Sequence, residues 1–296
     1  MELLIAGVNG YIGSNLYSHF IERYSVSSID FGNESIKKNY TNIDLSEIDN
    51  VKHYAKECTQ FDVLVFLVGL AHSKGKGKDL PEFKKANYHT LVYLLSSLKE
   101  NQKIPRKIIF ASTISVYGER YEREVYDETI SPKPFSPYAV TKLLAEEYLR
   151  NNHEANAWIL RFAPVYSKTF QLNIIRRTRI KNIFYKVGKG EKKLSLCNME
   201  NIMDSIVGII EGVIPPGVYN ISDPAAYTYN DLLNEQKAKN LVRIPIILIR
   251  LLHKIGKLIN NTFLIENSTK LLTNNIYPPS KIQSYVNLTA MRIKGK

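Results

Sequence analysis

The sequence predicts an α/β protein with a doubly wound parallel sheet and a smaller C-terminal α/β lobe. Short apolar runs alternate with longer helical patterns through the first half of the chain, which is the order of elements in βαβ units. One run, Val63–Val68, is apolar at every position, as in a strand that is buried on both faces. A glycine-rich turn joins the first strand to the first helix, as in sheets that bind ligands at the carboxyl ends of their strands.

The elements of the first half are expected to alternate along the chain. The predicted strands are Leu3–Ala6, Val26–Asp30, Val63–Val68, Lys107–Ala111 and Ala157–Phe162. The predicted helices are Asn9–Glu22, Val51–Cys58, Pro81–Lys99 and Pro137–Arg150. Right-handed crossovers between parallel strands then place helices on both faces of the sheet.

The composition is that of a globular protein that meets anionic partners. The chain has 296 residues, of which 44% are apolar and 23% are charged, and a formal net charge of +12. Such a charge favours nucleotides, diphosphates or an anionic membrane face, although a lysine-rich surface that only keeps a protein soluble has it too. Because no basic stripe is interleaved with aromatic residues, we expect no nucleic-acid partner.

The cysteines and the N-terminus indicate the compartment. Cys58 and Cys197 have no metal-ligand spacing around them, so no metal site is expected. The first residues contain neither a basic region nor a cleavage site, and no apolar run reaches transmembrane length. These features predict a cytoplasmic protein without a transmembrane segment.

The glycine-rich turn predicts a dinucleotide site. Gly7, Gly10 and Gly13 follow the first strand with the spacing G-x-x-G-x-x-G. Glycine lets the backbone turn sharply and approach a pyrophosphate closely, and the N–H groups at the start of the following helix bind the anion. Tyr11 and Ile12, in the same turn, are expected to take part.

Two acids at strand ends indicate which dinucleotide binds. Asp30 ends the second strand, where a carboxylate accepts both ribose hydroxyls of NAD and repels the 2′-phosphate of NADP. Asp44 lies where a third strand would end, and there it could bind the adenine amine. Each acid is alternatively an ordinary turn residue. NAD is therefore the expected cofactor, and NADP the less favoured one.

The pattern changes from about residue 165. Helices are predicted at Leu172–Ile183, Asn198–Gly212, Tyr229–Lys239 and Ile246–Asn260, with a strand at Gly217–Ser222 that returns to the main sheet. The predicted division is a dinucleotide-binding domain of residues 1–165 plus about 197–225, and a substrate-binding lobe of residues 166–196 plus 226–296.

One of three Tyr-x-x-x-Lys tetrads is expected to be catalytic. The tetrads begin at Tyr138, Tyr185 and Tyr277, about as many as chance gives in a chain with 19 tyrosines. Only Tyr138 and Lys142 lie on a good helical pattern, where the spacing i, i+4 puts both on one face. The lysine charge then favours the phenolate, which is a competent base for an alcohol proton.

These residues together resemble an extended short-chain dehydrogenase/reductase of the NAD-dependent epimerase/dehydratase family that acts on nucleotide sugars. The resemblance covers about residues 1–225. The matching pieces are the three glycines, Asp30, Val68–Ala71, Asn87–Thr90, Ser112–Gly118, Tyr138-x-x-x-Lys142 and Leu160–Tyr166.

The resemblance implies a role for each matching residue. It makes Thr113, Tyr138 and Lys142 catalytic. With the predictions above, the cofactor-binding residues are Gly7, Gly10, Tyr11, Ile12, Gly13, Asp30, Asp44, Leu70, Ala71, Asn87, Tyr138 and Lys142. The implied substrate-binding residues are Thr113, Ser115, Asn173 and Lys193. Lys193 stands where the family usually has an arginine, so a bidentate contact to a diphosphate is lost; alternatively it is a solvated loop lysine.

The resemblance implies a UDP-hexose 4-epimerase that serves surface polysaccharide synthesis, with a homodimer as its expected form. The alternative is an NAD(P)H-dependent 4-keto-sugar nucleotide reductase, because the same residues would carry one hydride step. Ile114 and Ser115 replace the acid pair of 4,6-dehydratases, which argues against a dehydratase. A lipid-linked sugar epimerase and a non-catalytic NAD-binding protein are further alternatives. The helix Ile246–Asn260 has an apolar stripe opposite basic residues, which fits packed core, a dimer contact or a weak membrane-surface contact.

Overall fold

The computed structural model describes residues 1–32, 37–70 and 79–291. Contacts between residues divide the chain into two compact units. The first contains Met1–Ser112, Pro137–Leu160 and Ile209–Val218, and the second contains Thr113–Ser136, Arg161–Gly208 and Tyr219–Lys296. The predicted division into a cofactor domain and a substrate lobe concerns the ligand that each part binds, and it stays a prediction.

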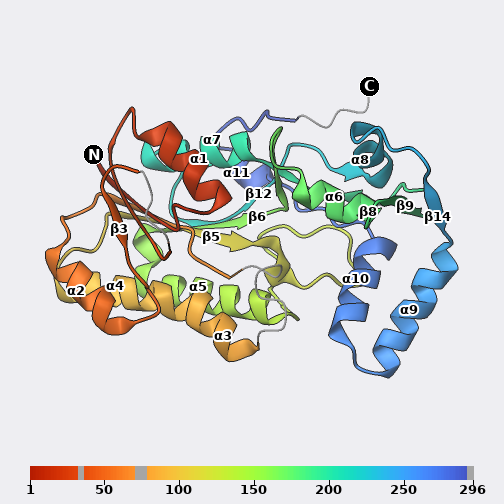
Figure 1. Cartoon of the computed structure of the whole chain (residues 1–296), viewed down its shortest axis with the longest axis horizontal. Helices are drawn as coiled ribbons and strands as arrows, with labels where there is room; N and C mark the ends of the chain where they lie inside the picture. Colours follow the sequence, from red (N-terminus) through yellow and green to blue (C-terminus); the bar gives the residue numbers. More distant parts are fainter. Residues whose placement is uncertain (33–36, 71–78, 292–296) are drawn as a thin grey trace. The chain divides into compact units, whose positions relative to one another are not determined.

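A seven-stranded sheet confirms the doubly wound α/β fold (Figure 1). In spatial order its strands are β12 (Gly217–Ile221), β6 (Ala157–Phe162), β5 (Lys107–Thr113), β4 (Val63–Phe66), β1 (Glu2–Ala6), β2 (Ser25–Asp30) and β3 (Tyr40–Asn42). The pairs β1–β2, β1–β4, β2–β3 and β4–β5 are parallel. The chain runs outward from β1 to β3 and then returns to β4, so the strand order reverses between β1 and β4, where such sheets bind ligands.

Helices cover both faces of this sheet. In Figure 1, α1 (Tyr11–Phe20) lies on one face, and α2 (Ile48–Glu57), α4 (Thr90–Glu100) and α5 (Pro137–His153) lie on the other. The residues of β4 and the apolar side of α4 are buried, among them Leu64, Phe66, Leu91, Leu94 and Leu95. Each such side chain contributes roughly 1.5–3 kcal/mol when it leaves water.

The helix predicted at Pro81–Lys99 is interrupted. It consists of α3 (Leu80–Lys84), a π-helical turn at Lys85–His89, and α4. Asp79 and Glu82 form a capping box at its start, which satisfies N–H groups that have no partner within the helix. A π-helical turn holds one residue more than an α-helical turn, and such turns are frequent at functional sites.

The second unit corrects the prediction of a helix at Leu172–Ile183. Helix α6 spans only Leu172–Thr178, and β8 (Arg179–Ile180) then pairs with β9 (Ile183–Val187) as an antiparallel hairpin. The backbone is already extended at Arg179, with φ −132° and ψ 142°. Lys181, with φ +54°, has the left-handed conformation that permits the tight turn between β8 and β9. The aromatic and β-branched residues of β9 also favour a strand.

The remaining elements complete the second half of the chain. They are α7 (Met199–Ile210), α8 (Tyr229–Glu235), α9 (Ile246–Leu258), α10 (Thr262–Leu272), α11 (Ser280–Gln283), β7 (Val165–Tyr166), β10 (Lys193–Leu194), β11 (Cys197–Asn198), β13 (Tyr227–Thr228) and β14 (Val242–Ile244). Helix α10 lies where the sequence pattern predicted no element. Within the residues described above, no helix is both long and apolar enough to cross a bilayer.

A buried carboxylate, that of Asp223, joins several of these elements. One of its oxygens accepts hydrogen bonds from the hydroxyls of Tyr166 and Tyr227, each at 2.7 Å. The other accepts from the backbone N–H of Asn198 at 2.6 Å and from the amide of Asn201 at 2.8 Å. These four donors stand in for water around a side chain that is 2% exposed.

Replacing this carboxylate should destabilise the protein. In Asp223→Asn, an NH₂ group takes the place of one oxygen and faces donors, so we expect a loss of about 2–4 kcal/mol in the free energy of unfolding. Urea unfolding measures the change. The control Asp49→Asn, at an exposed position in the first turn of α2, should cost less than about 1 kcal/mol. Equal costs for the two variants would contradict the role given to Asp223.

Candidate active site

The glycine turn after β1 is built to leave the start of α1 accessible to an anion. The Gly7 N–H donates to the Ile29 carbonyl at 2.9 Å, and the Ser14 N–H donates to the Gly10 carbonyl at 2.9 Å. A Cβ atom on Gly13 would lie 2.3 Å from the Gly7 oxygen, so only glycine lets the helix pack against the turn. Gly10 provides no side-chain cap, and the first turn contains no acid. No acidic side chain of the helix's own first turn therefore offsets the helix dipole.

The predicted ribose-binding residue, Asp30, also fixes this turn. Its Oδ2 accepts a hydrogen bond from the Asn9 N–H at 2.7 Å, and its Oδ1 accepts one from the Phe31 N–H at 2.8 Å. The end of β2 is thereby tied to the glycine turn, and the carboxylate lies beside the loop predicted to bind the pyrophosphate.

Asp44 lines a cavity at the edge of the sheet. The cavity has a volume of about 570 Å³, and its wall also includes Phe31, Asn42 and, from α2, His53 and Tyr54. Oδ1 of Asp44 accepts hydrogen bonds from the backbone and side chain of Ser46 at 2.9 and 2.6 Å. The carboxylate therefore shapes the turn after β3, and its contact with adenine stays a prediction.

Asn87 lies in the π-helical turn and holds the chain after β4. Its Oδ1 accepts from the Leu70 N–H at 2.6 Å, and its amide donates to the Leu70 carbonyl at 3.3 Å and to the hydroxyl of Thr141 at 3.1 Å. Asn87 thus connects the loop after β4 with α5, directly beside Lys142. Ala71, predicted to bind the cofactor, lies outside the described residues.

Lys142 is buried at the carboxyl ends of two neighbouring strands. Its Nζ donates to the carbonyls of Ala111 at 3.0 Å and Val68 at 3.4 Å, and it lies 4.7 Å from the centre of the Phe110 ring. The pKa of Lys142 is lowered to about 8. Burial causes the decrease, and the nearby Glu146 carboxylate opposes it in part. Tyr138 is half-buried one helical turn earlier on α5.

The predicted substrate residues belong to the second unit. Thr113 ends β5, is buried, and accepts a hydrogen bond on Oγ1 from the Ser115 N–H at 3.2 Å. The amide of Asn173 donates to the Val165 carbonyl at 2.8 Å, which fixes the start of α6 on β7. Lys193 is exposed, and its backbone N–H donates to the Asn274 side chain at 2.8 Å.

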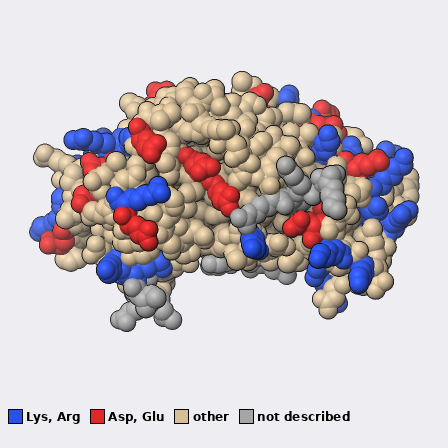
Figure 2. Space-filling view, turned by 90° about the horizontal axis from the view of Figure 1, so that it is seen from above, with Lys and Arg blue, Asp and Glu red and all other residues tan. Residues whose placement is uncertain are grey.

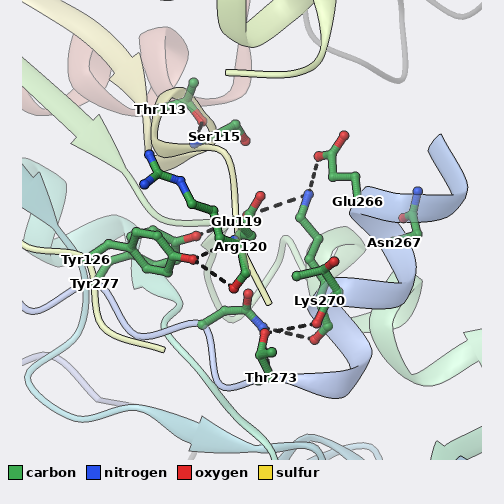
Figure 3. A network of polar contacts seen from close by, with 12 residues as sticks. Thr113, Ser115, Glu119, Arg120, Tyr126, Glu266, Asn267, Lys270, Thr273 and Tyr277 are labelled. Carbon is green, nitrogen blue, oxygen red and sulfur yellow. Dashed lines mark hydrogen bonds and ion pairs between the residues drawn. The ribbon is translucent and has the colours of Figure 1, made fainter. Parts of the chain in front are cut away.

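Figure 3 shows a polar network on the segment that follows Thr113 and Ser115; its members Glu119 and Tyr277 are buried, whereas the Lys270 side chain is 32% exposed. The Tyr277 hydroxyl donates to Glu119 at 3.0 Å, and Lys270 lies 3.6 Å from Glu119 and 2.5 Å from Glu266. Burial opposes the charge of Lys270, but the two carboxylates outweigh that effect and raise its pKa. The sequence pattern gave no sign of this network, because its members lie far apart along the chain.

Comparison with known proteins identifies the family. The model of the NAD-dependent epimerase/dehydratase family matches residues 3–222. The chain belongs to this family. NAD is therefore the cofactor of its family, as the glycine turn and Asp30 predicted.

Curated relatives agree at low identity. An uncharacterized UDP-glucose epimerase of Bacillus subtilis is 27% identical over 187 residues, which are 56% of this chain and 57% of the relative. A probable dTDP-glucose 4,6-dehydratase of Sinorhizobium fredii is 26% identical over 177 residues, which are 53% of this chain and 49% of the relative. The chain spans about half the length of these relatives.

Solved structures share the fold. The UDP-glucuronic acid 4-epimerase of Bacillus cereus, solved in complex with NAD, matches with a TM-score of 0.70 and 19% identity, over 99% of this chain and 93% of the other. The similarity of fold to this structure therefore continues beyond residue 222, the last residue that the family model matches.

The three Tyr-x-x-x-Lys tetrads of this family member differ as predicted. Tyr185 lies on strand β9, and Tyr277 is buried outside any helix with its hydroxyl bound to Glu119. Only Tyr138 and Lys142 share one helix. No group of three or more His, Cys, Asp or Glu side chains in the described ranges is placed to hold a metal ion.

Sequence reasoning missed the residues that hold α5. The Ser112 hydroxyl donates to Glu146 at 2.5 Å, and both side chains are buried. Glu146 lies one turn beyond Lys142, so the same contact fixes the helix and places a negative charge near the buried ammonium. A signal was present: a glutamate four residues after the lysine would share its face.

The depressed pKa predicts how stability depends on pH. Between about pH 8 and 10.5, the unfolded chain holds a proton on Lys142 that the folded chain has lost. The wild type should therefore gain stability relative to Lys142→Met as the pH rises through this window, by up to about 3 kcal/mol. Urea unfolding at several pH values measures the difference, and Lys52→Met, at an exposed site on α2, corrects for the loss of one charge. A difference that is constant with pH would contradict the burial of an ammonium group.

Proposed function

We propose that the protein is an NAD-dependent 4-epimerase of a UDP-hexose. The observation that carries the proposal is the position of the Tyr138–Lys142 pair on α5, with Lys142 held at the carboxyl ends of β4 and β5. In the same unit, the glycine turn leads into a helix start without a side-chain cap. A base and an anion site thus occur on one sheet, as the reaction requires.

The residues present fit a bound dinucleotide. A Cβ would not fit at Gly13, and the start of α1 offers N–H groups to the pyrophosphate. Asp30 would accept the ribose hydroxyls, and Leu70, held by Asn87, would border the nicotinamide end. When bound, NAD supplies reversible hydride acceptance.

The chain's own residues would move the proton. The positive charge of Lys142 favours the phenolate of Tyr138, which removes the proton of the sugar C4 hydroxyl as the C4 hydride leaves. After the 4-keto sugar rotates, the hydride returns to its other face, and the Tyr138 hydroxyl gives the proton back. No proton or electron is gained or lost overall. Thr113 would donate a hydrogen bond to the reacting oxygen.

Recognition of the nucleotide sugar would lie with the second unit. We assign Ser115 to the sugar, and Asn173 and Lys193 to the diphosphate. Ile114 and Ser115 replace the two acids that eliminate water in dehydratases, which supports epimerisation over dehydration. We also propose that the reaction serves surface polysaccharide synthesis and that the protein works as a homodimer.

Removing the phenol should slow the reaction strongly. We expect Tyr138→Phe to lower kcat by about 10²–10⁴-fold, because general acid–base catalysis is lost, with a smaller change in KM. The assay resolves interconversion of UDP-hexose pairs by NMR without added reductant. The control Tyr185→Phe removes the hydroxyl of another tetrad and should change kcat less than about threefold. Reduction of a 4-keto nucleotide sugar by added NADH or NADPH, without interconversion of the UDP-hexoses, would instead identify a 4-keto-sugar reductase, and unchanged turnover in Tyr138→Phe would exclude Tyr138 as the acid/base.

The cofactor preference should depend on Asp30. In Asp30→Asn the charge that repels a 2′-phosphate is removed, so the ratio of the Kd for NADP to the Kd for NAD should fall by about tenfold or more. Calorimetry measures both constants. Asp62→Asn is a matched control, because Asp62 also accepts a backbone N–H, from Glu2 at 3.0 Å, but lies at the amino end of β4. An equal shift in both variants would contradict the assignment.

A further inference from the structure

Helix α9 has three distinct faces, and only one of them is buried. Ile249, His253 and Gly256 are the buried residues of this 13-residue helix. Their spacing, i, i+4 and i+7, makes one narrow stripe. Two of the three are a histidine and a glycine, so this stripe contains only one of the helix's many leucine and isoleucine side chains.

The buried stripe packs against α10, and the His253 ring also lies 5.5 Å from the ring of Tyr121. A Cβ atom on Gly256 would lie 2.9 Å from Cβ of Leu264, so the glycine permits the two helices to approach closely. Nδ1 of His253 lies 2.9 Å from the hydroxyl of Ser268, which is also buried. The α9–α10 hairpin is therefore fixed on its inner side, and the other side chains of α9 point elsewhere.

The second face of α9 is apolar and exposed. We call it the apolar face; its members are Ile247, Leu248, Leu251, Leu252, Ile255 and Leu258, with exposed fractions from 38% to 84%. They recur every three or four residues, so they are contiguous on one side of the helix. Ile259 and Phe263, 57% and 70% exposed, continue it through the turn to α10. Single exposed leucines are ordinary, but a contiguous patch indicates a binding surface.

The third face is basic. Arg250, Lys254 and Lys257 are exposed and share one side of the helix, between the buried stripe and the apolar face. Helix α9 contains no aspartate or glutamate. Figure 2, seen from above, shows Lys and Arg side chains at its right-hand end, with a few Asp and Glu side chains among them.

We infer that α9 is a membrane-surface helix whose occupant is an anionic phospholipid bilayer. Its length is below the roughly 20 residues that span a bilayer, but an apolar face bordered by cations is the pattern of a helix that lies in the interface. The apolar side chains enter the headgroup–acyl boundary, and the cations contact anionic headgroups. This inference does not depend on the proposed epimerase reaction.

The charges favour lipid over a second copy of the chain. Two α9 helices packed antiparallel through their apolar faces would bring their basic stripes to the same side, and α9 has no acid to compensate them. The nearest acid on α10, Glu266, already pairs with Lys270. An anionic surface needs no such compensation.

Vesicle sedimentation of the full chain tests the inference. The probes are vesicles of phosphatidylcholine, and vesicles in which phosphatidylglycerol replaces part of it. We expect binding to the anionic vesicles, and a partition coefficient lowered at least about tenfold in Leu251→Glu and in Lys254→Glu/Lys257→Glu. Because these sites are exposed, the variants should fold; circular dichroism checks this.

Two matched controls separate the helix from the overall charge. Val213→Glu changes another exposed apolar residue, 49% exposed against 54% for Leu251. Lys52→Glu/Lys56→Glu makes the same change in net charge on α2. Both should bind within about twofold of the wild type. Absence of wild-type binding, equal losses in the controls, or a dimer that Leu251→Glu dissociates without any effect on vesicle binding would each overturn the inference.

Discussion

Burial of the Lys142 ammonium group is the constraint on which the candidate site depends. A charged amine is costly to remove from water unless other groups replace its hydration. Here the replacements are the carbonyls of Ala111, in β5, and of Val68, just after β4, and a carboxylate one turn away. β4 and β5 pair in parallel register as far as Phe66 opposite Phe110, just before these two carbonyls. The sheet therefore positions the lysine, and α5 then positions the tyrosine.

This dependence explains which parts of the site were predictable from sequence. The glycine spacing, the strand-end acid Asp30 and the tetrad on a helix are local patterns, and each requires particular side chains at fixed intervals. The partners of Lys142 are backbone carbonyls, which any residue could supply, so no side-chain pattern indicates them. The contact of Ser112 with Glu146 crosses from a strand to a helix, and only the folded chain brings the two together.

The second unit was less predictable for a related reason. The run Leu172–Ile183 has apolar residues at helical spacing, but the structure places a turn at Lys181 within it, and β9 pairs with β14 rather than extending the helix. Helix α10 was not expected because two of its three buried residues, Ser268 and Thr269, are polar. The residues that donate hydrogen bonds to Asp223 are common types, and their role becomes evident only when the folded chain brings them together. Local periodicity fails where long-range pairing decides the structure.

The π-helical turn at Lys85–His89 has a consequence for comparing relatives. Because each added residue rotates the rest of a helix by roughly 100° about its axis, a chain with one residue fewer here could form an uninterrupted helix between the same endpoints. The asparagine at the position of Asn87 would then point away from the loop after β4, even if the residues on either side were unchanged. Alignments of this segment consequently need a gap inside a helix, and substitutions at Asn87 would disturb the loop and α5 together, so a weaker affinity in such a variant would not by itself indicate lost contact with the ligand.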